Sequence, residues 1–303
     1  MLTRRIAIAA ILLAGLATPA AAQEKLRIVA TFSILADLVR NVGGDRTEVT
    51  SLVPPNGDAH VYSPSPADAR TLSEARIVFT NGLGFEGWLA RLVKSSATRA
   101  DVVTVSKGIA PLKMPARGHA HGHGHSHGSG DPHAWQSVAN VKIYVANIRD
   151  ALIAKDSANR SVYETNAAAY LGRLDQLDSE VRETIARIPA ERRRVITTHD
   201  AFGYFRAAYG VEFIAPQGVS TDSEASAKEV ARIITQIRKQ KIPAVFLENV
   251  SDPRLLKRIA DETGARVGGT LYSDALTGEK GDAPTYIDMM RHNIRTLSAA
   301  LAG

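Results

Sequence analysis

The sequence predicts an α/β protein with two domains of the (βα)4 type, each built on a parallel sheet, joined by one long rigid helix. Three observations predict this plan. β-rich runs alternate with segments of helical periodicity in the first half of the chain, and the same alternation returns in its last third. Between these two regions, residues 159–188 carry apolar side chains at helical steps and contain no proline.

Residues 1–22 have the pattern of a secretory signal peptide, so they are not expected to be part of the fold. Arg4 and Arg5 precede an apolar run over residues 6–16, and three alanines end the segment. This run is shorter than the roughly 20 apolar residues that span a bilayer. We expect cleavage after the last alanine and export to the periplasm. The chain contains no cysteine, so we expect neither a disulfide nor a lipid anchor on an N-terminal cysteine.

The first domain is expected over residues 23–158. Its predicted strands are short runs rich in Val, Ile, Phe and Thr, over residues 25–32, 47–54, 75–82 and 101–108. Its predicted helices have apolar residues at steps of three and four, over residues 33–44, 85–96 and 137–156. A glycine pair ends the first of these helices. A histidine-rich loop over residues 118–129 interrupts the alternation before the last of them.

A single helix over residues 159–188 is expected to link the domains. Its apolar positions recur at helical steps, at Tyr163, Ala167, Tyr170, Leu174, Leu177, Val181 and Ile185. At 1.5 Å per residue such a helix is about 40 Å long, which is enough to cross the whole molecule. Pro189 ends it.

The second domain is expected over residues 189–303, where the alternation resumes. The predicted strands begin at residue 193 and lie over residues 193–202, 211–217, 242–249 and 265–276, the first of them running into a helix. The predicted helices are separate from these runs and lie over residues 225–240, 253–264 and 285–301.

Four side chains lie where such a fold places its ligands, beyond the carboxyl ends of parallel strands. They are His60, His133, His199 and Asp274, two from each predicted domain. Three imidazoles and one carboxylate form a four-coordinate set that suits Zn²⁺. The alternative that these residues bind no metal remains open at this point. A lone His at a strand end usually only forms hydrogen bonds, and an Asp before a helix usually caps that helix. If the set binds metal, protonation of its histidines should weaken binding below about pH 6.

The other histidines divide into two kinds. His292 lies in the last predicted helix and is interpreted as structural. The rest alternate with Gly, Ala and Ser in the loop, at His119, His121, His123, His125 and His127. Such a composition does not build a core. One interpretation is that this loop gathers additional Zn²⁺ near the cleft between the two domains and passes it to the four candidate ligands. The other is that the loop is a solvated tract whose metal affinity is incidental. The first interpretation is favoured.

The chain resembles the metal-binding solute-binding proteins of ABC importers, in the cluster that handles zinc and manganese. The resemblance covers the mature chain and depends on the motifs PPNGDAHVYSPSPAD, TNGLGFEGWL, DPHAWQSVANVKIYVANI, VITTHDAFGYFRAAYG, GVSTDSEASAKEV, LYSDAL and TYIDMMRHNIRTL. It implies that His60, His133, His199 and Asp274 bind the metal. Because manganese-type members tend to carry a carboxylate at the position of His199, it also favours zinc.

Two features depart from the family pattern. The usual Asp-Pro or Glu-Pro before the first ligand is replaced by GDAH. Asp58 in this motif is either an acceptor for an imidazole N–H or merely a loop residue, and we favour the loop residue. Some zinc-branch members also carry a disulfide in the second domain, which a chain without cysteine cannot form.

The resemblance implies a periplasmic high-affinity zinc-binding protein that captures Zn²⁺ between its domains, with limited closure, and delivers it to an inner-membrane ABC permease. A manganese receptor or a metal-dependent adhesin is the alternative within the family. A secreted zinc hydrolase, with Glu248 or Asp200 as its base, is the alternative from another class; the chain has no His-Glu-x-x-His motif, and a full shell leaves no position for water. We expect a monomer. Loading by a periplasmic metallochaperone stays open, and the net charge of +6 is scattered without a basic stripe, so no nucleic-acid partner is expected.

Overall fold

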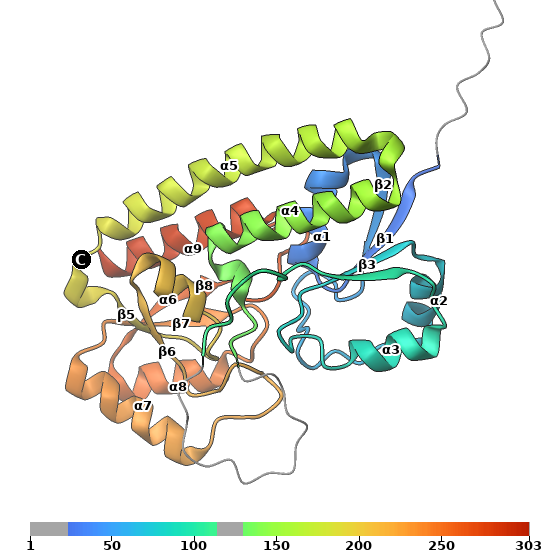
Figure 1. Cartoon of the computed structure of the whole chain (residues 1–303). Helices are drawn as coiled ribbons and strands as arrows, with labels where there is room; N and C mark the ends of the chain where they lie inside the picture. Colours follow the sequence, from blue (N-terminus) through green and yellow to red (C-terminus); the bar gives the residue numbers. More distant parts are fainter. Residues whose placement is uncertain (1–23, 114–129, 303) are drawn as a thin grey trace, which may run out of the picture.

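The computed structural model describes residues 24–113 and 130–302, and Figure 1 shows the arrangement of its elements. The predicted signal peptide over residues 1–22 and the histidine-rich loop over residues 118–129 lie outside these ranges. No helix within the described ranges combines the length and the apolar character needed to cross a membrane.

The N-terminal sheet is parallel throughout, with the strand order β2-β1-β3-β4. Its strands are β1 (Leu26–Ala30), β2 (Thr47–Ser51), β3 (Ile77–Thr80) and β4 (Asp101–Thr104). The helices between them are α1 (Ser33–Gly43), α2 (Pro66–Glu74) and α3 (Leu89–Ser96). In the register, Ile28 lies opposite Val49 on one side and Ile77 on the other. Ile77 and its neighbours in β3 are buried, as expected for a strand covered on both faces.

The C-terminal sheet repeats this topology with the order β6-β5-β7-β8, again parallel. Its strands are β5 (Arg194–Ile196), β6 (Glu212–Ile214), β7 (Ala244–Glu248) and β8 (Arg266–Leu271). Its helices are α6 (Gly203–Tyr209), α7 (Ala227–Gln240), α8 (Arg254–Thr263) and α9 (Tyr286–Leu301). In both sheets the chain therefore starts on an inner strand, moves to one edge and then crosses to the other side. The prediction of two parallel α/β domains is confirmed.

The long helix is α5 (Arg160–Ala186), which follows α4 (Val138–Lys155) in a helical hairpin. In Figure 1, α5 extends over both sheets, and it packs against α4, α1 and α9. All seven apolar positions predicted to face inward are buried: Tyr163, Ala167, Tyr170, Leu174, Leu177, Val181 and Ile185. The helical periodicity of the sequence thus predicts this helix and its inward face.

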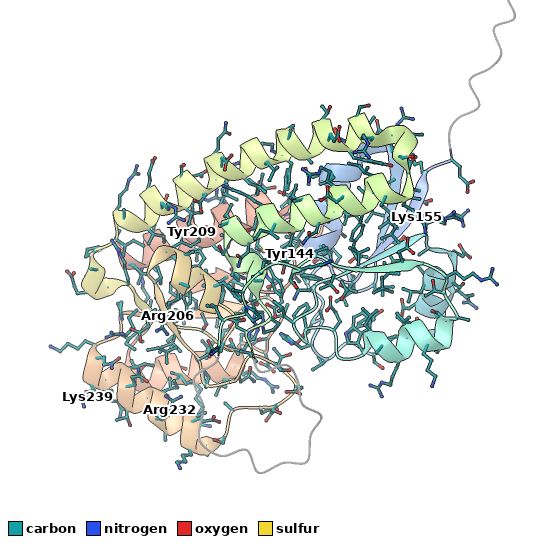
Figure 2. All side chains as sticks on the ribbon, in the orientation of Figure 1. Tyr144, Lys155, Arg206, Tyr209, Arg232 and Lys239 are labelled. Carbon is teal, nitrogen blue, oxygen red and sulfur yellow. The ribbon has the colours of Figure 1, made fainter. Side chains whose placement is uncertain are left out.

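One apolar core runs through both lobes. It extends from the N-terminal sheet through α1, α4, α5 and α9 to the C-terminal sheet. Tyr144 of α4 and Tyr209 of α6, both labelled in Figure 2, are buried, and the Tyr209 hydroxyl donates to Asp178 of α5 at 2.8 Å. A smaller core lies between the C-terminal sheet and α7 and α8. Because the larger core is shared, the two lobes are packed together as one body.

The structure corrects the sequence-based prediction at one helix. α2 is absent from the prediction because its segment is polar, with Leu72 as its one buried residue. Its start does carry a signal: the Ser65 side chain accepts from the Asp68 N–H, the Asp68 carboxylate accepts from the Ser65 N–H, and Pro66 occupies the first turn. Strands also end earlier than predicted, because the residues beyond them turn into loops, and the loops after β2, β4, β5 and β8 carry the candidate ligands.

Candidate metal centre

The four candidate ligands meet between the two sheets. One nitrogen from each of His60, His133 and His199 and one oxygen of Asp274 all lie within 4.8 Å of one another. Each residue follows the carboxyl end of a strand or stands at the loop before a helix, as the topology predicts. His133, His199 and Asp274 are fully buried, and the His60 side chain is 4% exposed. Among the described residues this is the one group of His and acidic side chains with such spacing.

Four of the distances between these atoms are close to the edges of a small tetrahedral coordination shell. Zn–N bonds of roughly 2.0–2.1 Å imply ligand-to-ligand edges of about 3.3–3.4 Å. The His60 Nε2 atom lies 3.2 Å from the His133 Nε2 and 3.3 Å from an Asp274 oxygen. The His199 Nε2 lies 3.0 Å from the same oxygen, and the His133 Nε2 lies 3.6 Å from the other. Three imidazoles and a carboxylate thus converge on one point.

His133 is oriented by the turn that precedes it. The backbone N–H of His133 donates to the Asp131 Oδ1 at 2.9 Å, and the His133 Nδ1 lies 2.8 Å from the same oxygen. A proton on Nδ1 therefore faces the carboxylate, which leaves the Nε2 lone pair free for a metal. Asp131 is buried, and a Cβ at Gly203 would lie 2.2 Å from its second oxygen, so a larger residue there would displace the carboxylate.

His199 is oriented by a carboxylate from the neighbouring strand. The Glu248 Oε1, at the end of β7, accepts from the backbone N–H groups of Thr198 and His199 at 2.7 and 3.0 Å. The Glu248 Oε2 lies 2.6 Å from the His199 Nδ1, although the angles of this contact fall outside the hydrogen-bond range. This arrangement directs the Nε2 of His199 toward Asp274.

Asp274 is held from the opposite lobe. The carbonyl of Ser273 accepts from the Trp135 Nε1 at 2.8 Å and from the Gln136 Nε2 at 2.7 Å, and both donors follow His133 in the chain. The Asp274 Oδ1 is buried and has no hydrogen-bond partner within the described residues. A buried carboxylate oxygen without a donor is expensive unless a cation binds it, so this atom fits a metal ligand.

In the electrostatics of the cluster, burial and mutual attraction oppose each other. Burial opposes a charge on His199, but the carboxylates of Glu248 and Asp274 outweigh it and raise the pKa of His199 well above its ordinary value. Burial likewise opposes a charge on Asp274, yet His199 and His133 hold the pKa of Asp274 well below its usual range. Burial lowers the pKa of His60 against the pull of Asp274. His199 and Asp274 thus favour their charged forms, whereas His60 favours the neutral form.

The remaining sequence-based candidates lie outside the cluster. The His292 Nε2–H donates to the Thr270 carbonyl at 3.0 Å, and the ring packs on Tyr272. Asp200 lines a surface pocket bordered by Arg206 and Arg232, which Figure 2 labels at α6 and α7.

Asp58 binds no imidazole in the described contacts. Its Oδ1 accepts from the backbone N–H of His60 at 2.9 Å, and its Oδ2 accepts from the Thr221 hydroxyl at 2.6 Å. Asp58 is therefore a loop residue, as favoured, but with a contact to the opposite lobe that the sequence does not indicate.

Comparisons with known proteins show which family the chain resembles. The family described as "Zinc-uptake complex component A periplasmic" (ZnuA) matches residues 28–300. The manganese-binding lipoprotein MntA of Halalkalibacterium halodurans is 35% identical over 279 residues, 92% of this chain and 89% of its own length. The iron-binding protein YfeA of Yersinia pestis is 36% identical over 283 residues, 92% of this chain and 88% of its own length.

Among solved structures, the periplasmic zinc-binding protein TroA from Treponema pallidum superimposes with a TM-score of 0.85 and 32% identity, covering 92% of this chain and all of that one. The manganese-bound periplasmic metal-binding protein from Candidatus Liberibacter asiaticus superimposes with a TM-score of 0.80 and 29% identity, with the same coverage.

These matches extend over nearly the whole described chain, and the named metals differ among them. Receptors of this family carry metal for transport and are not enzymes, which excludes the secreted hydrolase. The chain belongs to the ZnuA family, the periplasmic metal-binding receptors of ABC transporters.

Proposed function

We propose that this protein captures Zn²⁺ in the cleft between its lobes and delivers it to an inner-membrane ABC permease. One observation carries the proposal: three imidazole nitrogens and one carboxylate oxygen, on side chains that are buried or nearly so, lie within 4.8 Å of one another. His60 and His133 come from the N-terminal lobe, and His199 and Asp274 from the C-terminal lobe. Each binds the ion through the atom that faces the cluster, so the ion joins both lobes.

Zinc is preferred to manganese on the chemistry of the donors. Imidazole nitrogen suits Zn²⁺, whereas Mn²⁺ prefers a larger number of oxygen ligands. The cluster offers three nitrogens and one carboxylate, and that carboxylate, Asp274, supplies at most two oxygens. Relatives named for manganese, iron and zinc show that family membership alone does not choose the metal.

The four ligands bind and release without chemistry on the ion. Their full set leaves no coordination position for an attacking water. Asp131 and Glu248 hold two of the imidazoles in the tautomer that presents Nε2, and the hydrogen bonds to Ser273 hold Asp274 in place. Release to the permease then requires movement of a loop, because the lobes share one core.

The test is a zinc competition titration of the chelator-stripped protein. His60→Ala, His133→Ala and His199→Ala each remove a ligand, so each should weaken zinc binding by more than the roughly 10–100-fold that loss of an outer partner costs. His292→Ala is the matched control and should bind as the unaltered protein does. Unchanged affinity in any of the three variants removes that residue from the proposed shell, and no zinc uptake by the unaltered protein refutes the function.

The same titration with Mn²⁺ decides the metal. Zn²⁺ should bind more tightly, as the stability order of divalent ions predicts for a nitrogen-rich site. Tighter binding of Mn²⁺ instead supports the manganese receptor.

Three further points stay predictions. The five loop histidines are proposed to gather additional Zn²⁺ beside the cleft, with or without a metallochaperone. The protein is expected to be a monomer, which size-exclusion chromatography with light scattering checks. Some relatives are named lipoproteins, whereas this chain contains no cysteine, and the mass of the exported protein tests whether it is unanchored.

A further inference from the structure

Two of the candidate ligands, His60 and His133, each end a three-residue turn, and both turns have the pattern Asp-x-His. In both turns the backbone N–H of the histidine donates to the Oδ1 of the aspartate at 2.9 Å, from His60 to Asp58 and from His133 to Asp131. This hydrogen bond closes the turn on itself in each case. The two imidazoles therefore leave their turns from equivalent backbone positions.

The middle residue of each turn is also anchored in the same way. The carbonyl of Ala59 accepts from the Trp88 Nε1 at 2.8 Å, and the carbonyl of Pro132 accepts from the Asn81 Nδ2 at 2.9 Å. Both donors belong to the N-terminal lobe. The backbone of both turns is thus fixed from within that lobe. The turns differ in the second hydrogen-bond partner of the aspartate.

The aspartates have different second contacts. Asp131 turns to its own histidine, with the His133 Nδ1 2.8 Å from its Oδ1. Asp58 instead uses its Oδ2 to accept from the Thr221 hydroxyl at 2.6 Å. Thr221 belongs to the segment that joins β6 to α7 in the C-terminal lobe (Figure 1). His60 therefore has support from the opposite lobe where His133 has support from its own turn.

His60 is also the ligand nearest to solvent. Its side chain is 4% exposed, whereas His133, His199 and Asp274 are fully buried, and the following Val61 is 52% exposed. We therefore expect an ion to leave the cluster past this imidazole. Whatever holds the His60 loop in place therefore slows the escape of the ion.

We propose that Thr221 is a positioning residue for the metal: its hydrogen bond to Asp58 holds His60 in the coordinating position and slows metal release. The inference rests on the proposed zinc-binding function. Removing the Thr221 hydroxyl leaves the bond from the His60 N–H to Asp58 and the Trp88 anchor in place, so the turn still forms. The loop then opens more often, and zinc dissociates faster while its association is little changed.

The experiment measures zinc dissociation by stopped-flow mixing of the loaded protein with excess chelator, with association measured in parallel. Thr221→Val keeps the shape of the side chain and removes the hydroxyl. We expect about a 10-fold faster dissociation, at the lower end of the effects of lost outer partners on metal sites. Thr221→Ser restores the hydroxyl and should restore the slow rate. Ser220→Ala is the matched control, because the Ser220 hydroxyl accepts from the Asp222 N–H within the same loop.

The outcomes separate this inference from the proposed function. Unaltered protein that takes up no zinc refutes the function itself. Unaltered protein that binds zinc, together with Thr221→Val at the same dissociation rate, overturns the role of Thr221 alone. Thr221→Val could also lower the thermal midpoint of the metal-free protein while its zinc dissociation rate equals that of the unaltered protein. This result overturns the role of Thr221 too, because it is the behaviour of a merely structural contact. Faster dissociation in Ser220→Ala as well assigns the effect to the loop in general and overturns it too.

Discussion

Glu248 and Asp131 each place a carboxylate behind an imidazole of the cluster, but their geometries differ. The Glu248 Oε1 is engaged by two backbone N–H groups, and its Oε2 faces the His199 Nδ1. In Glu248→Gln the oxygen should stay with the backbone, so the amide NH₂ faces Nδ1. That favours the tautomer with its proton on Nε2, which blocks the metal. Asp131 uses one oxygen for both the His133 N–H and its Nδ1, so Asp131→Asn keeps the required acceptor.

Glu248→Gln should therefore weaken zinc binding about 100-fold and Asp131→Asn about 10-fold, at the two ends of the usual range for such partners. Glu212→Gln, which alters a carboxylate paired with Arg194 outside the cluster, is the control. Competition titration with a chelating dye measures all three affinities. Equal losses in Glu248→Gln and Asp131→Asn contradict the tautomer argument.

The pH dependence of zinc binding follows from the charge on His199. Because the Glu248 and Asp274 carboxylates raise the pKa of His199 well above its ordinary value, the metal-free protein carries a proton there that Zn²⁺ must displace. Affinity should thus rise with pH through 6.5 and continue to rise above it, instead of weakening only below about pH 6 as an unperturbed histidine predicts. Because the pKa of His60 is lowered, protonation of His60 causes no further loss of zinc affinity in this range. Dissociation constants across about pH 5.5–8.5, in non-chelating buffers, check this; a plateau from pH 7 upward contradicts it.

The sequence predicts the four ligands better than it predicts what orients them. Strand ends and the family resemblance indicate His60, His133, His199 and Asp274, since topology brings strand ends together. Their partners are set by side-chain directions that a linear pattern does not contain. Asp131 had a usable signal, because it stands two residues before His133, whereas Glu248 lies 49 residues from His199 and drew attention only as a possible base.

At the scale of elements, periodicity succeeds where an apolar face is long and fails where it is short. The inward face of α5 repeats over 27 residues and is fully recovered from the sequence. α2 buries Leu72 alone, so its nine residues carry almost no periodic signal and only its capping residues mark it. Short strands such as β6 are overextended in the prediction because the apolar run continues past the sheet into the loop.

The packing of α1 against α9 contains a buried acid whose protonation should affect stability. The Asp37 carboxylate of α1 accepts from the backbone N–H of Tyr286, the first residue of α9, at 2.9 Å. Burial raises the pKa of Asp37 to about 6, in spite of that hydrogen bond and the nearby charges of Arg40 and Arg173. Between about pH 4 and about pH 6 the folded protein therefore holds a proton that the unfolded chain has released, so its free energy of unfolding falls as pH rises.

Asp37→Asn should remove the loss of unfolding free energy that ionisation of this acid causes, which is about 3 kcal/mol at pH 7 for a shift of this size. Denaturant unfolding of the metal-free protein at pH 4, 5, 6 and 7 measures it, as the difference in free energy of unfolding between variant and unaltered protein. That difference should move in favour of Asp37→Asn as pH rises. A constant cost of the amide does not affect the test, and parallel pH curves for the two proteins contradict it.

At the scale of the whole molecule, the shared core and the interlobe hydrogen bonds decide how metal exchange can occur. Trp135 and Gln136 of one lobe bind the Ser273 carbonyl of the other, and the Ser33 hydroxyl accepts from the Leu276 N–H at 2.9 Å. Separating the lobes would break these contacts together with the core beneath α5. Movement of the His60 loop against the Thr221 segment disturbs far less buried surface. Metal exchange is therefore expected to depend on loops while the two sheets stay in place.

The residues at the two ends of the histidine-rich segment are bridged to each other, so the segment can be deleted without separating the elements on either side of it. Lys113 and Gly130 form an antiparallel bridge, and the Asp131 N–H donates to the Leu112 carbonyl at 3.0 Å. Deleting residues 118–129 leaves 114–117 to connect this bridge, a length that hairpin loops commonly have. The support of His133 by Asp131 should survive, so one tight zinc site with unchanged affinity is expected.

If the loop histidines gather zinc, the deletion should lower the number of zinc ions bound per protein at saturation, or slow loading of the tight site. Isothermal titration and stopped-flow loading measure these two quantities. A full-length variant with glutamine in place of the histidines is the matched control, because it keeps the length of the segment and removes only its imidazoles; the positions are His119, His121, His123, His125 and His127. Stoichiometry and loading rate equal to those of the unaltered protein in both variants mean that the segment takes no part in capture. Loss of the tight site in the deletion but not in the glutamine variant means instead that the segment acts through its backbone on the Asp131 turn.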